Sequence, residues 1–432
     1  MEAIISFDQG PALSVPLRFL LTAPVFGAAA GLFLAWVGPD VLASRWTPGA
    51  LVLTHLITVG YMLQAMFGAL LQFVPVAAGG SLWRPALLAG AVHPVITAGA
   101  VLLCASFADW QPAALRYAAV LLGSGCVGYG LAAGVALARS RASGVALPAL
   151  RAAVLSLLAT VALGVLLVEA IGGSLVLELV KTTDLHAAWG LGGWALLLLA
   201  GVSMYVVPMF QLTPPYPAWL CRALPAGVLG SLLALSILVA LTDNAGWQEL
   251  AVTTGTLLTT IFAAGTLWLQ QRRRRRTTDA TFLFFRSAML CLLAACCVLA
   301  FVQAEPRADP AWQTRLGVLL LDGVFVSAIN GMLYKIVPFL CALRLQRTGG
   351  SLRGRSGMLQ LVSREAMNGQ FWLHLVAVGL LLAATWLPEL TATAGIAFAS
   401  SCAWLEWNLA AATGRYRGLR DRIRAAAAAG GS

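Results

Sequence analysis

Three segments of the chain carry the same signature, Gly-x7-Gly-x6-Val-Pro, ending at Pro75, Pro208 and Pro338. A pattern that recurs at a long, nearly constant interval predicts an internal structural repeat. We expect the glycines to let neighbouring helices approach closely in lipid. We expect each proline to end its helix, because proline removes a donor and clashes with the preceding turn. The glycines of the three copies are Gly60 and Gly68, Gly193 and Gly201, and Gly323 and Gly331.

The composition places the repeat in a membrane. The chain has 432 residues, of which 60% are hydrophobic and 10% are charged, and its mean hydropathy is +0.85. Apolar runs of about twenty residues, enough to cross a bilayer, recur along the whole sequence. We find no separable soluble domain and no basic amino-terminal segment with a cleavage site. The eight cysteines lack a Cys-x-x-Cys pattern and predict neither a disulfide framework nor a metal framework.

We predict a single all-α membrane domain over residues 1–432, with twelve transmembrane helices arranged as three parallel four-helix repeats. The repeats cover residues 19–138, 152–271 and 281–413, and 414–432 form a basic tail. Four spans are an even number, so successive repeats run in the same direction and are related by an axis along the membrane normal. The predicted spans are 19–38, 51–76, 86–107, 117–138, 152–173, 186–211, 224–242, 250–271, 281–304, 313–342, 370–388 and 394–413.

The basic residues predict the orientation. With twelve spans, every arginine-rich loop falls on one side of the membrane, which is the cytoplasmic side by the positive-inside rule. Both termini are then cytoplasmic, and we expect a multi-pass protein of the bacterial inner membrane. The same distribution explains the net charge of +11 without nucleic acid as a partner. The basic segments are 139–151, 272–276, 344–364 and 415–424.

The four histidines are the first candidates for chemistry. His55 and His186 open predicted spans 2 and 6 at equivalent places, in the outer half of the membrane. An ionisable residue inside a membrane is costly and marks a functional site by default. Imidazole is also a common ligand of haem and metals, so we interpret His55 and His186 as haem or copper ligands, with His93 assisting. We interpret His374 as structural or as part of a proton route.

Acidic and basic residues within the predicted spans suggest a second kind of site. Asp322 lies in the third copy of the signature, on the same outer half as His55 and His186, and it could assist them in ligation. Lys335 and Glu406 lie toward the cytoplasm. They either neutralise each other as a buried pair or contribute, with Asp322 and His374, to a proton or ion path.

Twelve spans in three four-helix arcs, with a histidine opening span 2 and a glycine-rich run ending in Val-Pro, resemble subunit I of the haem–copper oxidases. The closest local match is the segment from His55 to Pro75. The resemblance implies that His55 ligates a low-spin haem and that His186 lies in the span that supplies a copper ligand. However, the family's histidines are missing from Leu316–Leu340 and from Ala223–Thr242. The chain looks most like the histidine-poor relatives of this architecture, which include the NnrS-type proteins linked to nitric-oxide stress.

These observations predict a membrane protein that binds haem b or copper and has a respiratory or nitric-oxide-related role, without oxygen reduction at a binuclear centre. Respiratory-chain subunits or an electron donor would be its partners, besides the lipid bilayer. Two alternatives stay open. One is a proton-coupled transporter or permease whose histidines titrate. The other is a cofactorless assembly or scaffold subunit.

Overall fold

The computed structural model describes residues 10–140, 144–242, 244–274, 277–305, 307, 309–347 and 360–429. These residues form helices and connecting segments, with no strand among them. Eleven of the described helices are long and apolar enough to cross a membrane. They are α1 (Ser14–Val37), a helix over Pro48–Val76, α4 (Pro85–Ala108), α5 (Pro112–Arg139), α6 (Leu147–Ile171), a helix over Leu179–Gln211, α9 (Ala218–Leu241), α10 (Ala245–Gln271), α11 (Ala280–Ala304), a helix over Ala311–Arg347, and α14 (Arg364–Ala384).

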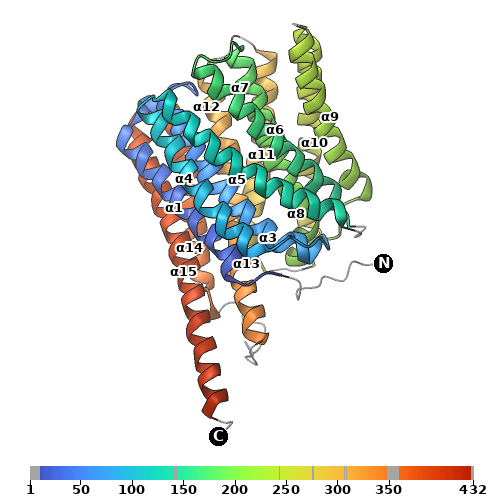
Figure 1. Cartoon of the computed structure of the whole chain (residues 1–432), viewed down its shortest axis with the longest axis vertical. Helices are drawn as coiled ribbons and strands as arrows, with labels where there is room; N and C mark the ends of the chain where they lie inside the picture. Colours follow the sequence, from blue (N-terminus) through green and yellow to red (C-terminus); the bar gives the residue numbers. More distant parts are fainter. Residues whose placement is uncertain are drawn as a thin grey trace.

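A further helix, α15 (Thr391–Ala429), covers the last predicted span. It has 39 residues, which corresponds to a length of about 58 Å at 1.5 Å per residue. The hydrocarbon core of a bilayer is only about 30 Å thick. Helix α15 therefore extends beyond the predicted twelfth span into the region predicted as the basic tail, and it projects from one end of the bundle (Figure 1). It is not one of the eleven helices named above, so the twelfth span stays a prediction.

The three helices that carry the signature share a local departure from α-helical geometry. Each contains a π-helical segment between two α-helical pieces, and the first signature glycine of each copy lies within it. We call them signature helices 1, 2 and 3. Signature helix 1 consists of α2 (Pro48–His55), η3 (Leu56–Leu63) and α3 (Gln64–Ala77); signature helix 2 of α7 (Leu179–Ala187), η4 (Ala188–Ala195) and α8 (Leu196–Gln211); signature helix 3 of α12 (Ala311–Val318), η5 (Leu319–Val326) and α13 (Ser327–Arg347).

The signature glycines lie where a second helix leaves no room for a side chain. A Cβ atom added at Gly60 would lie 2.4 Å from a ring carbon of Phe26 in α1, and one at Gly193 would lie 2.6 Å from Ser156 Cβ in α6. At Gly323 it would lie 2.9 Å from the side chain of Cys291 in α11. The expectation of close helix approach is confirmed. The same packing recurs three times: each signature helix lies with its glycines against the helix that begins the corresponding predicted repeat.

The expectation that proline ends each signature helix is wrong for the third copy, where α13 continues to Arg347 beyond Pro338. In the other two copies the helix ends within one turn of the proline: α3 ends at Ala77 after Pro75, and α8 ends at Gln211 after Pro208. Proline is tolerated inside a membrane helix when neighbouring helices and local π-type adjustment satisfy the freed backbone groups. The Val-Pro pair therefore lies in the last turn of the first two signature helices and within the third.

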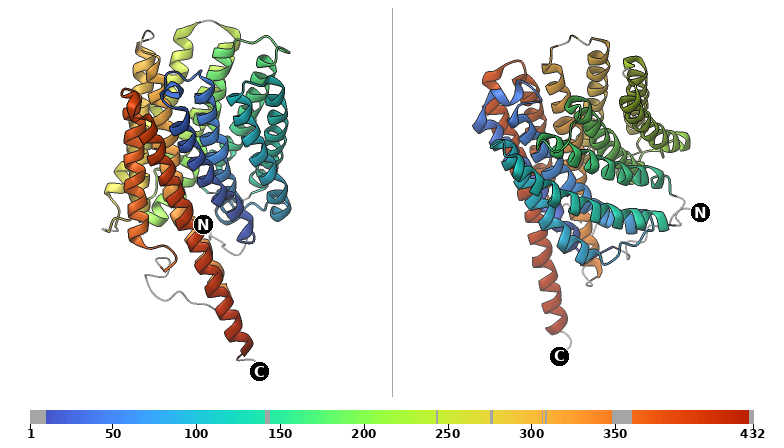
Figure 2. Two further views of the ribbon diagram at one scale, coloured as in Figure 1. Left: turned by 90° about the vertical axis from the view of Figure 1, so that its left-hand side faces the viewer. Right: turned by 45° about the horizontal axis from the view of Figure 1, so that its top comes forward.

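The bundle closes on itself (Figures 1 and 2). Helix α15 packs along α1 and α14, so the first and last described helices lie side by side within the bundle. Helix α5 packs on α6, and α10 packs on α11. The carbonyl oxygen of Gly10 accepts a hydrogen bond from Arg344 near the end of α13. The short helices η2 (Pro39–Leu42) and η7 (Pro388–Leu390) lie in connecting segments. Parts of the predicted basic loops, 141–143, 275–276 and 348–359, lie outside the described residues.

Candidate functional site

The imidazole rings of His55 and His186 each bond to a backbone carbonyl oxygen, His55 within its own helix α2 and His186 across to α6. The Nδ1 atom of His55 lies 2.8 Å from the carbonyl oxygen of Leu51, and Nδ1 of His186 lies 3.0 Å from that of Thr160. Because a carbonyl oxygen only accepts, each Nδ1 carries the hydrogen, and a neutral ring then keeps its free electron pair on Nε2. No hydrogen bond to a residue that the structure describes occupies either Nε2. Histidines that ligate a metal usually donate one ring N–H to an oxygen such as a backbone carbonyl and bind the metal through the other nitrogen.

The two histidines come from signature helices 1 and 2, and each lies against another helix: His55 against Phe107 of α4 and His186 against Thr160 of α6. On the same end of the bundle, Arg45 forms a 2.6 Å ion pair with Asp184. Arg45 precedes α2 and Asp184 lies in α7, so this pair ties together the beginnings of the two helices that carry the histidines. Both rings are part-buried, and that of His55 packs on Phe107 with a centroid distance of 5.2 Å.

His93 does not join this pair. Its Nε2 atom shares a 2.9 Å hydrogen bond with the hydroxyl of Thr22 in α1, and its ring packs edge-on against Phe19. His93 and Phe107 both lie on α4, and fourteen residues of α-helix correspond to about 21 Å. Since Phe107 contacts His55, His93 lies far from His55 along the axis of α4.

His374 lies in a closed hydrogen-bond network in the centre of the bundle. Its Nε2 atom is 2.8 Å from Ser327 Oγ, and its Nδ1 atom is 3.5 Å from Asn330 Nδ2. The hydroxyl of Ser327 donates to the carbonyl oxygen of Asp322, so the Nε2 atom of His374 must donate to Ser327. At the other end, the hydroxyl of Tyr61 donates to Asn330 Oδ1. Both ring nitrogens of His374 are engaged, which agrees with a structural role or a place in a proton route but leaves no nitrogen for a metal.

Lys335 does not pair with Glu406. Its Nζ atom lies 2.9 Å from Oδ2 of Asp279, and both side chains are about 15% exposed. Asp279 also begins α11, where its Oδ1 atom accepts from the backbone N–H of Phe282 at 3.0 Å. The interpretation of Lys335 and Glu406 as a neutralising pair is corrected, because the lysine faces the beginning of α11. The Oε2 atom of Glu406 is buried and has no hydrogen-bond partner among the described residues.

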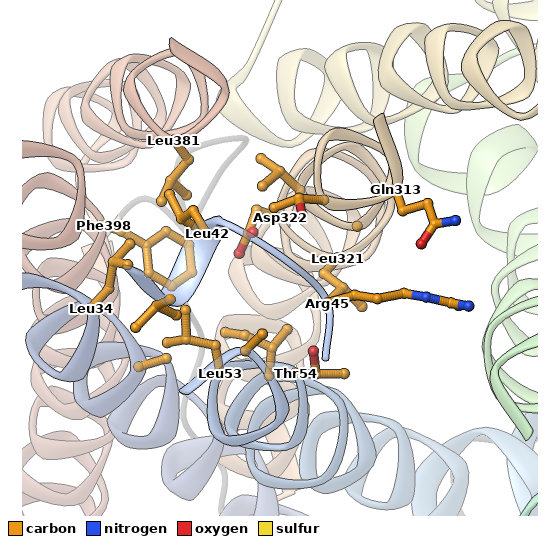
Figure 3. Close-up of a pocket in the computed structure, with 18 residues that line it drawn as sticks. Leu34, Leu42, Arg45, Leu53, Thr54, Gln313, Leu321, Asp322, Leu381 and Phe398 are labelled. Carbon is orange, nitrogen blue, oxygen red and sulfur yellow. The ribbon is translucent and has the colours of Figure 1, made fainter. Parts of the chain in front are cut away.

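Asp322 lies apart from both the histidine pair and the ion pair of Lys335. It is in the π-helical segment η5, is 9% exposed, and lines a cavity near the Arg45 end of the bundle. Figure 3 shows its carboxylate directed into that cavity, between leucine side chains and Phe398. The proposed ligand set of His55, His186 and Asp322 is not brought together, since Asp322 faces the cavity and His55 faces Phe107.

The donor atoms limit which group the histidine pair could hold. Among the described residues, no three histidine, cysteine or acidic side chains cluster as metal ligands, and the eight cysteines are free thiols. Two neutral imidazoles suit the axial positions of a haem, whose porphyrin supplies the other four nitrogens. They also suit copper, for which imidazole is a good ligand. The donor atoms present are therefore of the type that either group takes, and the assignment is a proposal.

Sequence reasoning identified the histidines but not their partners. The network also needs Tyr61 and Ser327, which look like ordinary residues of apolar spans, and the ion pair needs Asp279. An aspartate directly before the apolar run of α11 was a recognisable helix-capping signal. Tyr61 lies one residue after signature Gly60, but nothing in the sequence shows which helix its hydroxyl meets.

Comparison with models of known protein families finds no match for this chain, and comparison with curated proteins finds no matching relative. The function is therefore argued from the residues and their geometry.

Proposed function

We propose that the protein is a membrane metalloprotein that holds haem b or copper through the Nε2 atoms of His55 and His186. The observation that carries the proposal is that Nδ1 of each ring bonds to a backbone carbonyl, while Nε2 has no hydrogen bond to a described residue. A bound haem or copper supplies one-electron transfer. The protein's own part is to fix the ring orientation and tautomer and to keep the two side chains within the bundle.

The recurrence of the glycine packing supports the proposed three-repeat architecture and, through it, the relation to haem–copper oxidase subunit I. In each copy a signature helix with a π-helical segment packs on the helix that begins the repeat. We place the histidine pair in the outer half of the bacterial inner membrane, with both termini cytoplasmic.

The role we propose is redox or nitric-oxide chemistry, with respiratory-chain subunits or an electron donor as partners. A binuclear centre that reduces oxygen needs further histidine ligands. The chain has only four histidines, and none lies in α9 or in signature helix 3. Two of the four, His93 and His374, are already hydrogen-bonded elsewhere in the bundle.

The test is the metal content and absorbance of the full-length protein purified in mild detergent. The proposal expects a Soret band or stoichiometric copper that is lost in His55→Ala and His186→Ala but kept in His93→Ala. Protein without haem or copper, even after reconstitution with either, would instead favour a proton-coupled transporter or a cofactorless scaffold subunit.

A further inference from the structure

A cavity of about 110 Å³ lies near the Arg45 end of the bundle, between α1, signature helix 1, signature helix 3 and α14 (Figure 3). Its wall is mostly hydrocarbon. A single acidic side chain, Asp322, lines it. The principal apolar residues are Leu34, Leu42, Leu53, Leu321, Leu381 and Phe398.

The carboxylate of Asp322 has no partner in the cavity. The side chain is 9% exposed, and no hydrogen bond or ion pair joins its carboxylate to any residue that the structure describes. The Oγ1 atom of Thr314, which lines the same cavity, is buried without a hydrogen-bond partner among the described residues. A buried polar group without a partner is costly, so this hydroxyl and the carboxylate that faces the same cavity indicate a polar ligand.

No basic side chain neutralises Asp322. Arg45 also lines the cavity, but its guanidinium group forms the 2.6 Å ion pair with Asp184 and is directed away from Asp322 in Figure 3. Lys335 is held by Asp279. A monovalent cation in the cavity would therefore stabilise the ionised form of Asp322, which no described basic side chain contacts.

The wall favours an organic cation over a metal ion. Calcium takes six to eight oxygen ligands, and magnesium requires octahedral geometry. Here the lining side chains that carry oxygen are few: Thr54, Gln313, Thr314 and Asp322. An ammonium group needs fewer acceptors, and an aliphatic chain attached to it would bury its carbon against the leucines. The ring of Phe398 offers a further favourable surface for a cation.

The volume sets the size of the ligand. A cavity of about 150 Å³ in another protein holds benzene, which has six carbon atoms. The cavity here is smaller, at about 110 Å³. We propose that it binds a small protonated aliphatic amine of four or five non-hydrogen atoms, with its ammonium group on Asp322 and its chain among the leucines.

This site is separate from the histidine pair. Thr54 lines the cavity, whereas the next residue, His55, packs on Phe107. Successive residues of a helix point about 100° apart, so the two sites use different faces of signature helix 1. Amine binding does not depend on haem or copper, and either proposal can fail while the other holds.

The experiment is a calorimetric titration of the full-length protein in detergent with n-propylammonium chloride at pH 7. We expect saturable binding with one site per chain, and at least tenfold weaker binding of uncharged n-propanol and of sodium ion. Asp322→Asn, which keeps the shape and removes the charge, should weaken amine binding at least tenfold. The matched control Asp109→Asn changes an exposed aspartate at the end of α4 and should bind as the unmodified protein does.

Gly317→Leu gives a second variant in case Asp322→Asn does not fold. Gly317 lines the cavity, and a Cβ atom added there meets no heavy atom within 4 Å. The leucine should fill the cavity and abolish binding while the protein stays folded. The His55→Ala/His186→Ala double variant should retain amine binding. Absence of saturable binding, equal binding of propanol, or undiminished binding by Asp322→Asn or Gly317→Leu would overturn the proposal.

Discussion

The hydroxyl of Tyr61 donates a hydrogen bond to the Oδ1 atom of Asn330, which joins residues 269 positions apart in the chain. The bond connects the π-helical segment of signature helix 1 to signature helix 3. Through His374 it continues to α14. Buried hydrogen bonds therefore connect signature helix 1, signature helix 3 and α14 in the middle of an apolar bundle.

Tyr61→Phe should destabilise the protein by about 1–3 kcal/mol, because it leaves a buried amide oxygen without its donor. Asn330→Leu removes the acceptor as well, so the double variant should be less destabilised than the sum of the single variants. The coupling should fall between about 0.5 and 3 kcal/mol. Thermal unfolding in detergent measures it, and additive effects of the two substitutions would show that the bond contributes nothing.

Gly60→Ala should destabilise the protein by about 1–3 kcal/mol, the usual effect of overpacking. The added Cβ would lie 2.4 Å from the ring of Phe26, which is itself buried. Gly128→Ala is the matched control, because it is also a helical glycine but meets no atom within 4 Å. Equal melting temperatures for the two variants would contradict the close packing of signature helix 1 on α1.

The ion pair between Lys335 and Asp279 should be visible as energetic coupling. We expect Lys335→Met and Asp279→Asn to be coupled by about 0.5–3 kcal/mol in a double-mutant cycle. Lys335→Met and Glu406→Gln should be additive within about 0.5 kcal/mol. Energetic coupling of Lys335 to Glu406, with none to Asp279, would contradict this ion pair and support the Lys335–Glu406 pair that the sequence suggested.

Gly164→Ala should weaken cofactor retention without unfolding the protein. Its Cβ would lie 3.1 Å from the Cε1 atom of His186, so the imidazole must shift from the orientation that Thr160 fixes. Disturbing the groups that orient a ligand typically lowers metal affinity by about 10–100-fold. Gly123→Ala, where a Cβ meets nothing within 4 Å, should leave retention unchanged. Retention measured during dialysis against a chelator or a haem acceptor distinguishes the two.

The sequence predicted the spans well because apolar length alone decides which segments can cross a bilayer. It also predicted that a second helix packs closely at Gly60, Gly193 and Gly323, because a glycine leaves room for the neighbouring helix. It did not predict that signature helix 3 continues to Arg347 beyond Pro338. Whether a proline ends a membrane helix depends on neighbouring groups that satisfy the backbone, and those lie elsewhere in the sequence.

The candidate site was predicted only in part. His55 and His186 were identified because ionisable residues stand out in apolar spans, and their joint role as ligands stays a prediction. His93 and Asp322 stand out equally, but they face other neighbours. Which side of a helix faces which partner is fixed by its rotation in the bundle. Packing between helices sets that rotation. The sequence suggested that Lys335 faces Glu406, but in the structure it pairs with Asp279.

The most direct test of the central claim is the absorbance spectrum and copper content of the purified full-length protein beside its His55→Ala and His186→Ala variants. We expect either a haem Soret band or about one copper per chain in the unmodified protein. Each substitution should remove the signal while the melting temperature changes little, and His93→Ala should keep it. A protein that binds neither haem nor copper after reconstitution, or variants that bind as well as the unmodified protein, would contradict the assignment of His55 and His186 as ligands.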